Sequence, residues 1–117
     1  MKQISPKQDF KINLEATITS KELGLVQRLM IIYILINHQK NKDKLSYIKN
    51  GEMQNNLRIS TITFTTHRNK LEEMNLFTVM IKVDGRYIEV EPSARKSKRL
   101  YYFPNWDKLK GMNLITT

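Results

Sequence analysis

Residues 50–75, NGEMQNNLRISTITFTTHRNKLEEMN, restrict the fold of this chain more than any other segment. Asn50 can cap a short helix over residues 51–57. A short turn follows, and Ser60 is a second N-cap in front of an amphipathic helix that runs to Met74. Two helices joined by so short a turn form a helix-turn-helix unit, and the second helix needs a core on one face only.

Strand signals follow this unit without a break. Asn75 is expected to end the helix in the left-handed conformation, which Asn tolerates better than most residues other than Gly. Phe77 to Val83 is rich in β-branched and aromatic residues, and Asp84-Gly85 is a strong two-residue hairpin turn. Residues 86–90 form the returning strand, and residues 99–103 are a third strand candidate.

The first half of the chain predicts a strand and a long helix. Apolar and polar side chains alternate over residues 10–14, the period of a half-buried strand. Thr19 and Glu22 fit a capping box, so a helix is expected from there to about His38. Residues 45–48 are a short extended or helical link before the helix-turn-helix unit.

The order of these elements predicts an α+β fold of the winged helix-turn-helix type. It would have a three-helix core and a two- or three-stranded antiparallel wing sheet. With 117 residues the chain is long enough for one domain with a substantial core. We expect a winged-helix domain over residues 19–104, preceded by an N-terminal arm over 1–18 with one strand at most. Residues 105–117 would be a short C-terminal turn and tail.

Composition excludes several classes of protein. The apolar fraction is 40%, which argues against disorder, and cysteine is absent, which excludes disulfide scaffolds and thiol nucleophiles. The longest apolar run, Leu29 to Ile36, is far shorter than the roughly 20 residues of a membrane helix. Residues 1–18 carry charges throughout and lack the apolar segment of a signal peptide. A cytoplasmic location without membrane contact is therefore expected.

The chain has a formal net charge of +9, which favours polyanionic partners. Lys and Arg outnumber Asp and Glu by 9 to 4 in residues 1–49 and by 8 to 4 in residues 77–117, whereas residues 50–76 carry 3 of each. The helix-turn-helix unit is thus neutral between basic flanks.

The second helix of the unit has one face suited to a DNA major groove. Phe64, His67 and Leu71 share the face expected to pack inward, and the opposite face should be exposed. Asn can bond bidentately to adenine, and Thr or Ile methyl groups pack on the thymine methyl. The DNA-binding residues predicted here are Ser60, Thr61, Ile62, Thr63, Thr65, Thr66, Asn69 and Lys70.

Several polar and cationic positions of this helix allow more than one interpretation. Thr61 and Thr63, near the helix start, can reach phosphates. Arg68 and Lys70 lie at the edges of the exposed face, and each either contacts a phosphate or pairs with Glu72 or Glu73. The alternative for the whole face is an ordinary polar surface.

The loop over residues 92–98 and the residue that follows it form a basic segment with small spacers. Between two strands, such a segment can serve as a wing that meets backbone phosphate or enters the minor groove. The Asp84-Gly85 turn is the other candidate for the wing. The wing residues predicted to bind DNA are Arg95, Lys96, Lys98 and Arg99.

No set of residues suggests catalysis, a metal or a cofactor. His38 and His67 are the only histidines and lie in different predicted helices. The four glycines form no phosphate-binding loop, and no Ser, His and Asp have triad-like spacing. The aromatic residues from Tyr101 to Trp106 could stack on single-stranded bases, but such a cluster more often closes a core.

The segment ISTITFTTHRNKLEEMNLF resembles the winged-helix domains of phage and plasmid proteins from low-GC Gram-positive bacteria, notably replication initiators and replisome organisers. The upstream TSKELGLVQRLMIIYIL is similar to their first helix, and together the two segments span Thr19 to Phe77. This resemblance implies DNA binding in transcription regulation or DNA replication, on a mobile element.

We therefore expect a non-catalytic protein that binds double-stranded DNA. The alternatives are a winged-helix module that binds another protein and a single-stranded DNA-binding accessory protein of replication. A homodimer and a protein partner both stay open. The sequence does not distinguish a role in transcription from one in replication, and it names no target sequence.

Overall fold

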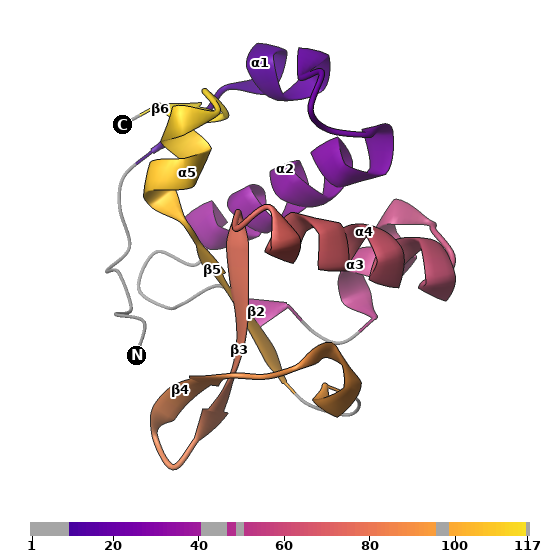
Figure 1. Cartoon of the computed structure of the whole chain (residues 1–117), viewed down its shortest axis with the longest axis vertical. Coiled ribbons are helices and arrows are strands. Elements are labelled where there is room, and N and C mark those ends of the chain that lie inside the picture. The colour runs from indigo at the N-terminus through magenta and orange to yellow at the C-terminus, as the bar shows by residue number, and fades with distance from the viewer. Residues whose placement is uncertain (1–9, 41–46, 49–50, 96–98, 117) are drawn as a thin grey trace.

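The computed structural model describes residues 10–40, 47–48, 51–95 and 99–116. Helices and antiparallel strands occur together in an α+β arrangement, with the helices gathered at one end of a four-stranded sheet (Figure 1). The helices are α1 (Leu14–Thr19), α2 (Leu25–Lys40), α3 (Glu52–Leu57), α4 (Thr61–Glu73) and α5 (Trp106–Gly111). The strands are β1 (Lys11–Ile12), β2 (Tyr47–Ile48), β3 (Phe77–Val83), β4 (Arg86–Glu89), β5 (Leu100–Pro104) and β6 (Ile115–Thr116), with a 3-10 turn over Pro92–Ala94.

The helix expected to begin at a Thr19 capping box begins instead at Leu25, as α2, and a separate helix, α1, ends at Thr19, so the predicted start is wrong. The Asn13 side chain caps α1 by accepting a bond from the Ala16 N–H at 3.1 Å. The Thr19 hydroxyl lies in the last turn of α1 and donates to the Glu15 carbonyl at 2.7 Å. A turn then leads to α2, which begins at Leu25. The strand expected over residues 10–14 is correspondingly reduced to β1.

The helix-turn-helix unit forms where it was predicted. The Ser60 hydroxyl oxygen caps α4 by accepting from the Thr63 N–H at 3.1 Å. Asn75 has φ 62°, and this left-handed residue turns the chain into β3. Gly51 occupies the N-cap position of α3 with φ 84°, whereas the predicted cap Asn50 lies outside the described residues. Arg58, with φ 57°, makes the turn between the two helices.

The main sheet has the order β2-β5-β3-β4, with every neighbouring pair antiparallel. The first half of β3 pairs with β5 and the second half pairs with β4, so the β3–β4 hairpin extends away from the helices (Figure 1). Asp84 and Gly85 have φ 51° and 77°, the two positive values of a tight hairpin turn. The chain from β4 must therefore pass β3 to reach β5.

Both ends of the described chain belong to the same core. β1 pairs with β6, a strand in the segment that was expected to be a tail. The Phe10 ring is tilted against Trp106 with ring centroids 5.1 Å apart, and Trp106 also meets His38 edge-on. Leu109 and Leu114 are fully buried beside them. The hydrophobic core therefore extends across the domain boundaries expected near residues 19 and 104. The aromatic cluster around Trp106 is part of this core.

Candidate nucleic-acid interface

Helix α4 presents one face to solvent and the other to the core. Phe64 and Leu71 are buried on the inner face, as expected, and His67 is half-buried. Ile62 is 80% exposed, and Thr66 is also exposed. The predicted orientation of the helix is therefore confirmed for these residues.

The other predicted DNA-binding residues near the two ends of α4 are mostly exposed. Thr61 and Lys70 are exposed, as is the cap Ser60, whose hydroxyl also donates to Oγ1 of the half-buried Thr63 at 2.9 Å. Thr61 Oγ1 accepts a bond from the Gln54 amide at 2.9 Å, which ties the start of α4 to α3. The solvent face of α4 is hereafter Thr61, Ile62, Thr66 and Lys70.

Two predicted readout residues lie on a flank rather than on the solvent face. Thr65 and Asn69 are half-buried on the side of α4 that also carries Glu72. The Oδ1 atom of Asn69 is buried and has no hydrogen-bond partner among the described residues. A bidentate adenine contact uses this oxygen together with the amide N–H group, so Asn69 must rotate outward to make one.

The inner side of α4 is held to α2 by a polar contact. The amide of Gln27, a buried residue of α2, lies 3.1 Å from Nδ1 of His67. This contact joins His67 of α4 to α2.

Arg68 is buried, which argues against the phosphate contact that was one of the two roles considered for it. Its side chain is 8% exposed, and its guanidinium carbon lies 5.1 Å from the centroid of the Phe64 ring. On the helix wheel Arg68 falls close to Phe64, which places it over the sheet rather than at the edge of the solvent face. Burial raises the pKa of the neighbouring Tyr102 hydroxyl above its ordinary value of 10.0, and the positive charge of Arg68 opposes that rise.

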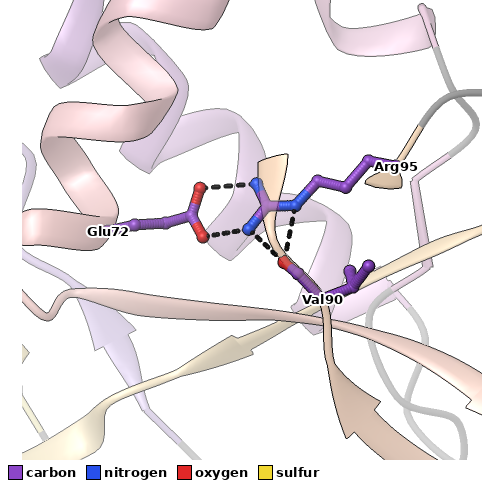
Figure 2. Close-up of polar contacts among 3 residues, drawn as sticks. All are labelled: Glu72, Val90 and Arg95. Atoms are coloured by element: carbon purple, nitrogen blue, oxygen red, sulfur yellow. Dashed lines mark hydrogen bonds and ion pairs between the residues drawn. The ribbon is translucent and has the colours of Figure 1, made fainter. Parts of the chain in front are cut away.

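Arg95 is also buried, so it is not the free wing cation that was predicted. Its guanidinium makes a bidentate contact with the carboxylate of Glu72 near the end of α4, with Nη1 donating to Oε2 at 2.6 Å (Figure 2). Nε and Nη2 both donate to the Val90 carbonyl, at 3.0 and 2.8 Å. The crossing from β4 toward β5 is thereby fastened to α4, and the charge of Arg95 is neutralised inside the protein.

Of the other three predicted wing residues, the structure describes one. Arg99 is exposed at the start of β5, whereas Lys96 and Lys98 lie outside the described residues. The β3–β4 hairpin supplies two further exposed cations, Lys82 and Arg86, on either side of its tip. The ammonium of Lys82 lies 5.6 Å from the centroid of the Tyr87 ring.

Sequence reasoning missed one exposed cation beside α4. Arg58 was assigned only to the turn, but it is exposed immediately before the solvent face begins. Its place in the short turn between the two predicted helices was the available signal, because turn residues mostly lie at the surface.

Within the described part of the chain, no three His, Cys, Asp or Glu residues are grouped as metal ligands. The helices described there also include none with the length and apolarity to cross a bilayer. Comparison with protein-family models, with curated proteins and with solved structures gave no match in any of the three.

Proposed function

We propose that this chain binds double-stranded DNA without catalysing a reaction, as a regulator of transcription or replication. In this proposal the solvent face of α4 enters the major groove. The observation that carries it is the exposure of Thr61, Ile62, Thr66 and Lys70 on a helix whose opposite face is buried. Methyl groups and hydroxyls at these positions match thymine methyls and base-edge acceptors.

The arrangement of elements supports the same interpretation. The elements follow one another in the order of a winged helix: α2, β2, α3, α4, the β3–β4 hairpin and β5. In the sheet, β5 lies between β2 and β3. The exposed cations Lys82, Arg86 and Arg99 then belong to the wing sheet, and they would meet phosphates beside the groove. Lys96 and Lys98 lie in the sequence between β4 and β5 and add two positive charges to that segment.

Binding should depend strongly on salt. If about six phosphates are neutralised, the affinity for duplex DNA falls roughly a thousandfold between 50 and 200 mM salt. Fluorescence anisotropy with a labelled random duplex measures this slope. A dissociation constant that stays unchanged across that range would contradict the proposal.

A matched pair of lysine variants locates the binding surface. Lys70→Ala removes an exposed charge from the solvent face of α4, and Lys108→Ala removes an exposed charge from α5. We expect the first to weaken duplex binding roughly threefold to tenfold and the second to leave it unchanged within about twofold, as for a single phosphate contact. Equal losses in the two variants would show that net charge, not α4, governs binding.

One observation favours the alternative of a protein-binding module. Ile62 is the most exposed large aliphatic residue of α4, and such side chains also anchor protein interfaces. A module of that kind would bind random duplex weakly and with little dependence on salt. Competition by single strands that exceeds competition by duplex would instead support the single-strand alternative.

A further inference from the structure

The side of α2 that faces solvent is aliphatic along most of its length. On a wheel of about 100° per residue, four side chains of α2 fall within roughly 60° of one another. Leu25 is 70% exposed, Leu29 41% and Ile36 40%, and Ile32 between them is half-buried. These residues, Leu25, Leu29, Ile32 and Ile36, are called the α2 stripe.

Within the described part of the chain, no element packs over this stripe. The opposite side of α2 supplies the core, through Met30, Ile31, Ile34 and Leu35, all nearly inaccessible to solvent. A helix that is buried on one side normally carries polar residues on the other. Steps of four, three and four residues are the spacing of a seam between two packed helices.

We propose that the α2 stripe is a homodimer interface, in which α2 packs antiparallel against α2 of a second copy. A two-fold axis uses the same patch on both copies, so a patch must be complementary to itself. Antiparallel pairing sets Leu25 opposite Ile36 and Leu29 opposite Ile32, and every contact is then between aliphatic side chains.

The shape of the surface favours the antiparallel orientation. A hollow of about 300 Å³ lies between α2 and α3 at the C-terminal end of the stripe, lined by Tyr33, Ile36, Asn37, Lys40, Glu52 and Asn56. Leu25, the most exposed residue of the stripe, stands at the other end. An antiparallel partner brings its Leu25 to the rim of this hollow at Ile36. A parallel partner would set the two Leu25 side chains against each other and leave both hollows unfilled.

Charge selects the same orientation. Lys40 is exposed at the C-terminal end of α2, and the turn before α2 carries the exposed Lys21 and Glu22. Antiparallel packing brings Lys40 toward a turn of the second copy in which the charges of Lys21 and Glu22 cancel, whereas parallel packing sets the two Lys40 ammonium groups side by side. The helix dipoles also oppose one another favourably only in the antiparallel case.

The size of the stripe indicates a weak dimer. From Leu25 to Ile36 the stripe extends roughly 16 Å along the helix axis. Such a face is smaller than the roughly 800 Å² that each partner buries in a stable complex. Leu14 and Ile18 on the adjoining α1 are 52% and 54% exposed and would widen the contact. We expect a dissociation constant on the order of 10 to 100 µM.

The dimer leaves the solvent face of α4 free. α4 packs on the core side of α2, where Gln27 meets His67, and the α2 stripe faces away from that contact. The inference therefore does not require DNA binding, and its test uses no DNA.

Sedimentation of the full chain over about 1 to 500 µM, on either side of the expected dissociation constant, tests the proposal. The weight-average mass should rise from monomer toward dimer with concentration. Leu29→Glu should raise the dissociation constant at least about tenfold, because it buries a carboxylate in the seam. Ile88→Glu is the matched control: Ile88 on β4 is 45% exposed and lies outside the stripe, so this variant should dimerise like the unaltered chain.

Charge placement tests the orientation. Leu25→Glu alone should weaken the dimer, and adding Ile36→Lys should restore it, because antiparallel helices set the introduced carboxylate of one copy against the introduced ammonium group of the other. Parallel helices would set like charges together, so the double variant would be the weaker one. A chain that remains monomeric at about 500 µM, or equal dimerisation of Leu29→Glu and Ile88→Glu with unchanged circular dichroism, would overturn the proposal.

Discussion

Individual charged residues differ in whether they reach solvent, and this decides which of them can meet a partner. Arg68 and Arg95 both looked available in the sequence, but both are buried. Arg68 covers the Phe64 ring, and Arg95 is paired with Glu72. Arg58 gives the opposite case, since a turn residue is exposed beside α4. Charge counts along the chain therefore overstate the basic surface near α4.

The contact between Glu72 and Arg95 leads to a prediction about stability. Glu72→Gln presents an amide N–H group to the guanidinium and leaves the buried charge of Arg95 without a counterion. We expect a loss of about 2 kcal/mol in the free energy of unfolding, within the range for a hydrogen bond to a charged group. Urea unfolding followed by circular dichroism measures it.

The neighbouring Glu73→Gln is the control for this substitution. Glu73 is exposed, and its replacement should change stability by less than about 0.5 kcal/mol. If both variants unfold at the same urea concentration, the buried pair contributes nothing measurable.

At the scale of elements, a helix N-cap was predicted correctly where the residues after the cap also form a helix. Ser60 precedes an amphipathic helix, and Asn105 accepts from the Lys108 N–H at the start of α5. Thr19 and Glu22 have the same spacing as a capping box, but Thr19 lies within α1. A cap motif specifies hydrogen bonds that a segment can make, and it does not specify whether a helix has already begun upstream.

The start of α4 provides the prediction at this scale. Ser60→Ala removes the acceptor of the Thr63 N–H and should lower the free energy of unfolding by about 1 kcal/mol. Thr66→Ala, on the exposed middle of the same helix, should change it by less than about 0.5 kcal/mol. Thermal unfolding of the two variants compares them directly, and a larger effect for Thr66→Ala would argue against the assigned cap.

For the whole molecule, the contact between the two ends of the described chain is the main feature that the sequence did not reveal. β1 lies within the strand expected over residues 10–14, but β6 has only two residues, too few for a period-two pattern to be recognised, so their pairing was not foreseen. Their pairing sets Ile12 beside Ile115, and Trp106 lies against Phe10 in the same core. Residues 105–116 therefore complete the domain rather than trail from it.

Substitution of the central aromatic residue of this contact tests its importance. Trp106 is 5% exposed, and Trp106→Ala should lower the free energy of unfolding by about 3 to 5 kcal/mol, as for other buried aromatic residues. Lys108→Ala on the exposed side of α5 should have an effect below about 0.5 kcal/mol. A Trp106→Ala variant that unfolds like the unaltered chain would mean that the C-terminal segment is not part of the cooperative core.

By itself the sequence determined the α+β class, the helix-turn-helix unit, the β3–β4 hairpin and the exposure of Ile62 and Thr66. Each of these follows from interactions between residues near one another in the chain: caps, turns and the period of apolar side chains. Tertiary structure alone decided the burial of Arg68 and Arg95, the partly buried position of Asn69, the pairing of β1 with β6 and the exposed α2 stripe. These depend on contacts between distant segments, and the physical reason is that burial is set by what packs on a residue from elsewhere in the chain.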